Sequence, residues 1–412
     1  MSDAASLSPA AVEHVARASY GKLVAYLSAR TRDVAKAEDA LAFSFLEALS
    51  RWPKSGIPDS PEAWLLTVAR RQLVDQARRA MTAERGIDHL TLLSEELREA
   101  PHDIPDERLS LMFACAHPAI DVRMRAPLIL QTVLGFDAAN IARAFLIAPA
   151  TMSQRLVRAK AKIKDAGIPF RIPARDELPE RLEAVLAAAY ATFSAGWADP
   201  MGADAQRKGL ADEAIWLARL IVELLPEEPE ALGLLALLLH IDARRLARRD
   251  DFGRFIPLME QDPARWRSGM IEEADALLSR ASTFRCIGRY QLEAAIQSAH
   301  AIRRRTGRAD WAALERLYDR LYELTRSPVV ALNRAVIIAE TRGAQEGLEV
   351  LDALAQDKRL ADYQPYWAAR ADLLARLSDK AAANDAYLRA IGLEADPAVR
   401  DFLEERRKRV MA

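Results

Sequence analysis

The chain has 412 residues, of which 51% are hydrophobic and 28% are charged. Its 58 Lys and Arg balance 59 Asp and Glu, so the protein is not a polycation and any nucleic-acid surface has to be local. The chain has only two cysteines, Cys115 and Cys286, and this small number excludes a disulfide framework. No run approaches the ~18–20 apolar residues of a membrane span, and the N-terminus does not resemble a signal peptide. We therefore expect a soluble, cytoplasmic protein without a membrane partner.

Helical periodicity runs through the sequence. Apolar residues recur at three- and four-residue spacing near both ends, as in Val12–Leu27 and Leu317–Val330. Ala, Leu and Arg, all strong helix formers, are abundant, and no Asn-Gly or Asp-Gly hairpin turn occurs. The pattern predicts an all-α fold.

Proline and glycine divide the chain into blocks. The proline-rich residues 53–61 interrupt the first helical block, and Ser60 with Pro61 predicts an N-cap followed by proline at the first helical position. Residues 82–105 are polar and acidic and are expected to form a linker. Gly167 is expected to follow the end of a helix.

The most informative pattern lies between residues 136 and 164. A short helix is expected at 136–146, capped by Asp137, then a turn at 147–150 and a second helix from Thr151 to Lys164. The second helix has an apolar face that would pack inward, formed by Met152, Leu156, Ala159 and Ile163.

The opposite face of this second helix is polar and basic, with no acidic residue before Asp165. A helix, a tight turn and a basic helix make a helix-turn-helix, whose second helix enters the major groove of DNA. Polar residues at its start suit base edges, and the trailing cations suit phosphates. The alternative is a solvated basic helix face. The candidate DNA-binding residues are Ser153, Gln154, Arg155, Arg158, Lys160 and Lys162.

Two segments near the C-terminus, 329–354 and 367–391, have a similar residue pattern. The pattern is typical of a helix pair, with a repeat of about 34 residues. Small residues at the expected helix crossings and an aromatic residue in a second helix favour tetratricopeptide-like packing. An ordinary helical bundle remains the alternative.

The helix from Thr151 resembles the region 4 recognition helix of extracytoplasmic-function (ECF) sigma factors. Residues 33–41 are similar to a helix start in sigma region 2, and residues 64–79 are similar to its W-L-x-x-x-A-R helix. Further motifs resemble an ECF subgroup with a long helical, tetratricopeptide-like extension; they lie at 113–118, 223–230, 242–245, 260–266 and 327–335.

This resemblance implies a sigma factor that binds core RNA polymerase and directs initiation at promoter DNA. Region 4 would read the minus-thirty-five element, while region 2 would bind the polymerase and the minus-ten element. The implied phosphate contacts of region 2 are Arg70, Arg71, Arg78 and Arg79. The implied polymerase-binding residues are Glu38, Asp39, Leu41, Phe45 and Leu49.

The resemblance also predicts the domain organisation. Sigma region 2 is expected at 8–81, the linker at 82–105 and region 4 at 106–170. A helical extension domain at 176–290 and tetratricopeptide-like repeats at 291–410 would follow. We expect the extension to regulate activity and to bind a signalling protein or a ligand.

Two departures from the family pattern bear on these expectations. Phe43 stands where the family usually has an acidic residue, which leaves open a helical-repeat interaction scaffold with a degenerate sigma head. A separate alternative is an ordinary helix-turn-helix repressor, which would require dimeric half-sites. Cys115 and His117 alone are too few ligands for a zinc site. Because the chain also lacks the common nucleotide-binding, metalloprotease and hydrolase motifs, we expect no enzyme, no metal and no cofactor.

Overall fold

The computed structural model describes residues 19–81, 104–145, 147–174, 176–197 and 205–412. These residues form helices joined by turns, with one isolated β-bridge between Arg249 and Phe255, so the prediction of an all-α fold is confirmed for them. Residues 8–18 of the expected first domain and 82–103 of the expected linker lie outside the described residues. No helix within the described ranges is long and apolar enough to cross a bilayer.

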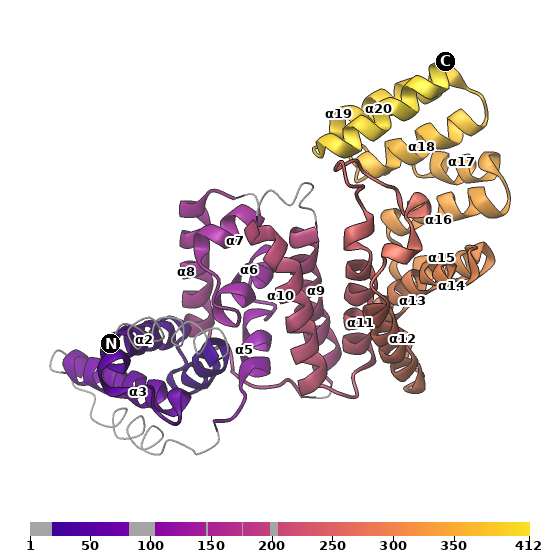
Figure 1. Ribbon diagram of the computed structural model, residues 1–412. Helices are drawn as coiled ribbons and strands as arrows, with labels where there is room; N and C mark the ends of the chain where they lie inside the picture. Colours follow the sequence, from indigo (N-terminus) through magenta and orange to yellow (C-terminus); the bar gives the residue numbers. More distant parts are fainter. Residues whose placement is uncertain (1–18, 82–103, 146, 175, 198–204) are drawn as a thin grey trace. The chain divides into compact units, whose positions relative to one another are not determined.

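The chain divides into two compact units, the first ending at Gly196 and the second beginning at Trp197 (Figure 1). The first unit starts with a helical segment at residues 19–31, followed by α2 (Val34–Ser55) and α3 (Pro61–Met81). The Asp33 carboxylate accepts the backbone N–H of Lys36 at 3.2 Å and so caps α2. Helix α3 begins at Pro61, as predicted. The shared core of these three helices includes Leu23, Leu27, Leu41, Leu65 and Leu66.

The rest of the first unit consists of α5 (Arg108–Cys115), α6 (Val122–Thr132), α7 (Ala138–Ala144), α8 (Pro149–Asp165) and α9 (Leu178–Trp197). Helix α8 begins two residues before the expected Thr151, because Pro149 suits the first position of a helix. Its end is as predicted: Gly167 has a φ of +59°, and the N–H of Ile168 donates to the Ile163 carbonyl at 3.0 Å.

Helix α9 joins the first unit through α5. The guanidinium of Arg181 donates to the carbonyl of Phe113 at 2.7 Å. The first compact unit includes α9 up to Gly196. The domain boundary expected at residue 176 stays a prediction.

The second unit is built around α11 (Pro229–Ala243), a helix that is apolar and buried on almost every side. Gly233 of α11 allows the backbone of Gln291 to come so close that a Cβ would lie 2.7 Å from the Gln291 nitrogen. The helices packed directly around α11 are α10 (Ala205–Leu224), α12 (Ser268–Thr283) and α13 (Arg289–Ala301).

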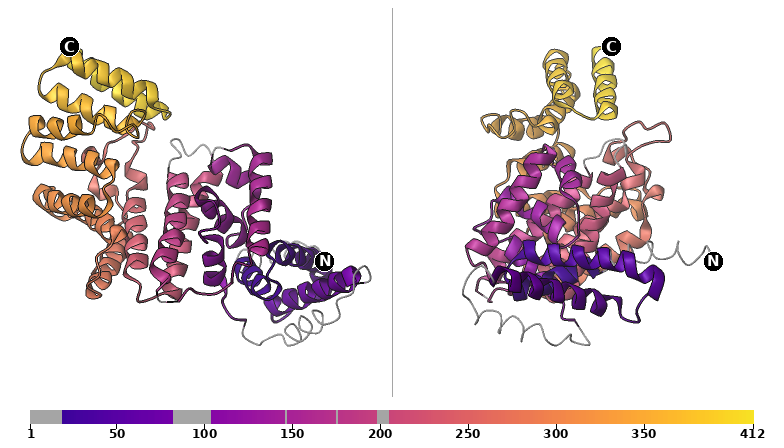
Figure 2. Two further views of the ribbon diagram at one scale, coloured as in Figure 1. Left: turned by 180° about the vertical axis from the view of Figure 1, so that it is seen from behind. Right: turned by 90° about the vertical axis from the view of Figure 1, so that its left-hand side faces the viewer.

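Helix pairs follow α13, α14 (Arg303–Thr306) and α15 (Trp311–Thr325), and Figure 2 shows their succession from two further sides. The pairs are α16 (Pro328–Thr341) with α17 (Ala344–Ala353), and α18 (Gln364–Arg376) with α19 (Lys380–Leu393), before a final α20 (Pro397–Met411). A Cβ on Gly347 would lie 2.6 Å from the Ala339 Cβ, so a small residue is needed where α16 and α17 cross, as predicted.

Candidate nucleic-acid interface

Helix α8 presents one face to the interior of the first unit and another to solvent. Its four predicted inward residues, Met152, Leu156, Ala159 and Ile163, are buried. Five of the six candidate DNA-binding residues lie on its exposed surface, namely Ser153, Gln154, Arg155, Arg158 and Lys162. We call Arg155, Arg158 and Lys162 the outer face of α8.

A hollow of about 350 Å³ adjoins the outer face of α8. Its opposite wall is the start of α6, where Arg123 adds a fourth cation. Asp121 is the only acid among the described residues that line the hollow, and it already pairs with Arg123 at 3.2 Å. The hollow therefore has an excess of positive charge, as a phosphate-binding surface requires. Our sequence analysis missed Arg123, because it lies outside the helix-turn-helix pattern.

The sixth candidate, Lys160, points to a different partner. Its Nζ lies 2.6 Å from Oε2 of Glu38 in α2, and the two side chains are only 11% and 14% exposed. One turn further along α8, Lys164 Nζ lies 3.0 Å from Oδ2 of Asp33. In this arrangement Lys160 is bound to the protein itself and is not available to DNA.

Burial dominates the electrostatics at Glu38. It raises the pKa of the Glu38 carboxyl above its ordinary value, although Lys160 acts in the opposite direction. The neighbouring Tyr20 hydroxyl also has a raised pKa, caused first by burial and then by the charge of Glu38. Glu38 is thus a desolvated carboxylate whose compensating cation comes from another helix of the same unit.

The residues expected to bind polymerase fall on different sides of α2. Leu41 is fully buried in the core and Phe45 is half-buried, whereas Asp39 and Leu49 are exposed. The exposed apolar side chains of α2 follow one stripe at three-residue spacing, with exposed fractions of 37% for Phe43, 66% for Leu46 and 44% for Leu49. We call these three residues the apolar stripe of α2.

The arginines of α3 also lie on different sides of their helix. Arg70 is buried, and its Nη2 donates to the Tyr26 hydroxyl at 2.5 Å, so it holds α3 against residues 19–31. Arg71 and Arg78 are exposed, and Arg78 lies 4.0 Å from Asp75. Arg79 belongs to α3, but its side chain lies outside the described part.

Cys115 and His117 have different surroundings, although they are only two positions apart. Cys115 is buried, with its Sγ 3.4 Å from the Thr132 hydroxyl, and burial raises its pKa to about 12. The Nδ1 of His117 accepts the backbone N–H of Ala119 at 3.1 Å. Among the residues that the structure describes, no group of three or more His, Cys, Asp or Glu could hold a metal ion.

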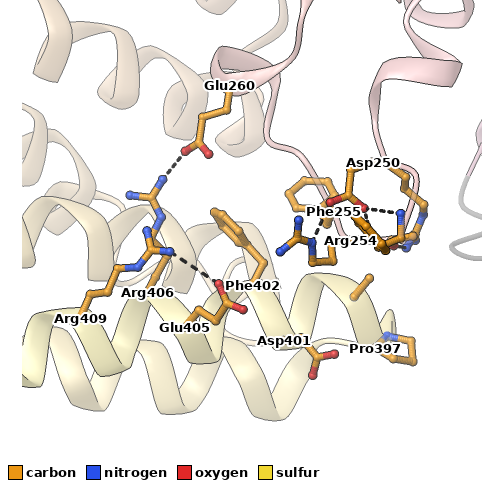
Figure 3. A pocket seen from close by; sticks show the side chains of 14 residues that line it. Asp250, Arg254, Phe255, Glu260, Pro397, Asp401, Phe402, Glu405, Arg406 and Arg409 are labelled. Atoms are coloured by element: carbon orange, nitrogen blue, oxygen red, sulfur yellow. Dashed lines mark hydrogen bonds and ion pairs between the residues drawn. The ribbon is translucent and has the colours of Figure 1, made fainter.

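The second unit contains a larger hollow, of about 580 Å³, between residues 249–260 and α20 (Figure 3). Phe255 and Phe402 form its apolar part, with ring centroids 5.5 Å apart. Its cations are matched by acids: Arg254 pairs with Asp250 at 2.7 Å, and Arg406 pairs with Glu260. This charge balance distinguishes it from the basic hollow beside α8.

The arrangement of the first unit can now be compared with known proteins. A family model for sigma-70 region 2 matches residues 15–82, the segment that contains residues 19–31, α2 and α3. The chain therefore carries a sigma-70 region 2 domain, and such a domain implies binding to core RNA polymerase. A model for a family of unknown function (DUF6596) matches residues 181–282.

The chain is also similar over most of its length to an uncharacterized protein from Rhizobium meliloti. The two are 38% identical over 369 residues, which cover 88% of this chain and 87% of the relative. The chain belongs to the same family as that protein. No solved structure matches it.

Proposed function

We propose that the protein is an ECF-type sigma factor that binds core RNA polymerase and directs it to promoters. The sigma-70 region 2 domain is the observation that carries this proposal. The basic α7–α8 pair in the same compact unit supports it, because a sigma factor of this type needs a second, DNA-reading module.

In this proposal α8 reads the minus-thirty-five element. Ser153 and Gln154, exposed in the first turns of α8, contact base edges. The outer face of α8 contacts phosphates, and Arg123 on the other wall of the hollow adds a phosphate contact. A phosphate backbone fits this hollow because the cations that line it outnumber its one acid.

Region 2 provides the other two contacts of the proposal. The apolar stripe of α2, with Asp39 one turn before it, binds the polymerase. Replacement of the usual acid by Phe43 then extends an apolar docking surface. Arg71 and Arg78 contact the backbone of the opened minus-ten strand. Arg70 is assigned to the core of region 2, where it holds Tyr26.

The second unit is proposed to regulate the first. A truncation that tests this should end at Gly196, so that α9 keeps its contact with α5. Increased transcription by the truncated protein would identify an inhibitory extension, and lost transcription a required one. Unchanged transcription would contradict a regulatory role.

The proposed function is tested by transcription in vitro with core RNA polymerase and the DNA upstream of the protein's own gene cluster. We expect specific transcripts that are lost in the double variant Arg155→Ala/Arg158→Ala. The matched control is Arg316→Ala/Arg320→Ala in α15, which removes two exposed arginines from the second unit. Failure to bind core polymerase would contradict the proposal and favour the interaction scaffold. Duplex binding without polymerase would favour a repressor.

A further inference from the structure

Most arginines that the structure describes in the second unit form an ion pair with an acid of the same unit, as Arg359 does with Asp357 at 2.7 Å. Three arginines in and just after α14 differ. Arg304, Arg305 and Arg308 are exposed, and the side chain of none of them forms an ion pair or a hydrogen bond with another described residue. We call these three residues the basic turn.

The basic turn is held in one position by the residues around it. The side chain of Arg303, which is buried, donates to three backbone carbonyls of residues 258–261 at 2.9–3.0 Å. Gly307 ends α14 with a φ of +70°, and its N–H donates to the Arg303 carbonyl at 2.8 Å. The Thr306 hydroxyl lies 2.9 Å from the carbonyl oxygen of Arg308. A ligand that binds the basic turn therefore has little backbone to order.

The acids near the basic turn are already engaged elsewhere. Residues 303–310 contain four arginines and a single acid, Asp310, whose carboxylate caps α15 through a hydrogen bond of 2.9 Å. On α12, the pKa of Asp275 is lowered first by its hydrogen bond with His240 and less by the charge of Arg305. The basic turn thus keeps an excess of positive charge.

Buried cations of the same unit have the same sign. Burial first, and then the positive charges of Arg244 and Arg303, lower the pKa of His300. Positive charge is therefore concentrated around Arg303, both inside the unit and in the basic turn, although the whole chain has a net charge of −1. Such a local excess attracts a polyanion.

The residue types of this segment favour one kind of polyanion. The planar guanidinium of arginine binds phosphate oxygens in pairs. Residues 303–310 include no aromatic residue, and Trp311, which follows them, is half-buried against the core of α13, α15 and α16, so no stacking surface is offered to unpaired bases. An acidic protein surface would also need apolar contacts, and the only apolar side chain in this segment is Ala309. A row of duplex phosphates needs neither.

We propose that the basic turn binds the phosphate backbone of duplex DNA without reading its sequence. The inference rests on the proposed function, because a polymerase holoenzyme at a promoter is what brings duplex DNA to this protein. The second unit then adds phosphate contacts to those of α8. Its contribution to promoter affinity is largest at low salt and falls as salt rises.

The first test is promoter binding by the polymerase holoenzyme, titrated with salt. The test variant is Arg304→Gln/Arg305→Gln/Arg308→Gln. The matched control removes the same charge from exposed arginines that are paired with acids, in Arg320→Gln/Arg359→Gln/Arg389→Gln. The test variant should reduce the slope of log K against log salt by about 2.7, at about 0.9 for each lost contact, and weaken binding at least about tenfold at low salt. The control should leave the slope unchanged.

The second test uses the full chain alone with a duplex that carries no promoter sequence, at low salt. Arginines are modified with phenylglyoxal and located by mass spectrometry. The duplex should protect the basic turn and leave the modification of Arg359 unchanged. This measurement needs no polymerase and no variant, so it does not depend on whether a variant folds.

The outcomes separate this inference from the proposed function. If the basic-turn variant behaves like its control in the salt titration and the duplex leaves the basic turn reactive, the inference is overturned. It is also overturned if the variant loses affinity for core polymerase while its salt slope on DNA is unchanged, which would make the basic turn a protein contact. If the wild-type chain does not bind polymerase but the duplex protects the basic turn, the proposed function fails and the DNA-binding surface stands.

Discussion

Two adjacent arginines of α3 have opposite environments. Arg70 is buried against Tyr26, and among the described residues no partner is found for its buried Nε. Arg71 is exposed. We expect Arg70→Ala to lower the free energy of unfolding by about 2–3 kcal/mol, because it removes a buried hydrogen bond and leaves a gap between α3 and residues 19–31.

The control for that prediction is Arg71→Ala, which should change the free energy of unfolding by less than about 0.5 kcal/mol. Chemical denaturation followed by circular dichroism measures both. An equally small effect of Arg70→Ala would contradict the core role of Arg70.

Two lysines of α8, only two positions apart, should also behave differently. Lys162 lines the basic hollow, whereas Lys160 is paired with Glu38. Lys162→Ala should weaken binding of the polymerase holoenzyme to promoter DNA and reduce the slope of log K against log salt by about 1. Lys160→Ala should leave this slope unchanged. The measurement is a salt titration of promoter binding, and a reduced slope for Lys160→Ala would make it a DNA contact.

The two thiols differ in reactivity for an electrostatic reason. Because burial raises the pKa of Cys115 to about 12, only about one in ten thousand of its thiols is ionised at pH 8. Cys286 is exposed. A thiol-reactive dye should therefore label Cys286 rapidly and Cys115 only after the protein is unfolded. Two rapidly labelled thiols in the folded protein would contradict the burial of Cys115.

At the scale of the elements, one helix of the second unit caps another. The Glu230 carboxylate in α11 accepts the backbone N–H groups of Tyr290 and Gln291, at 2.9 and 3.2 Å, and so satisfies the start of α13. A Cβ on Gly288 would lie 2.2 Å from the Glu230 carboxyl carbon, which explains the glycine there.

We expect Glu230→Ala to lower the free energy of unfolding of the second unit by about 1–3 kcal/mol, because the start of α13 loses its acceptor. The exposed Glu227 belongs to the same motif, and Glu227→Ala should cost less than about 0.5 kcal/mol. Thermal unfolding of the full chain compares the two. Equal stability of both variants would show that Glu230 is not a cap.

Local signals in the sequence were sufficient to predict the all-α fold and some helix ends. Pro61 starts a helix and Gly167 follows one, because each acts on backbone groups within a few residues. The helix start at Asp33 was expected only from the resemblance to sigma region 2. The sequence also held a signal that we did not use. Arg70 lies four residues after the buried Leu66 and three before the buried Leu73, so the helical period already placed it on the inner face of α3.

The contacts between distant elements could not be predicted in the same way. Glu38 and Lys160 are 122 positions apart, and Glu230 and Tyr290 are 60 apart. A lysine on a basic helix gives the same local pattern whether it binds phosphate or a carboxylate elsewhere in the chain. Only the packing of α8 on α2 separates Lys160 from the outer face of α8.

At the scale of the whole molecule, the polymerase-binding and base-reading contacts of the proposed function are in the first unit, while the second unit contains buried basic groups of its own. His300 in α13 has its pKa lowered to about 4, first by burial and then by the charges of Arg244 and Arg303. Arg303 donates to the backbone carbonyl of Met259 at 3.0 Å. It cannot move away without breaking its hydrogen bond to the segment that contains Met259. His300 is therefore held neutral inside the second unit.

This gives the second unit a predictable pH dependence. The unfolded chain takes up a proton at His300 near the ordinary pKa of ~6.5, whereas the folded chain does so only near pH 4. Its contribution to stability is thus complete above about pH 6.5 and is lost as the pH falls toward 4, by about 2 kcal/mol at pH 4.5.

His300→Gln should remove this dependence, because glutamine does not titrate. The measurement is the difference in unfolding free energy between wild type and His300→Gln at pH 7 and at pH 4.5. That difference isolates His300 from carboxyls such as Asp275, whose pKa is lowered chiefly by its hydrogen bond with His240 and which titrates in both proteins. Between pH 7 and pH 4.5 the wild type should lose about 2 kcal/mol more of its unfolding free energy than His300→Gln does. A difference that stays constant would mean that His300 binds its proton equally well in the folded and unfolded chain.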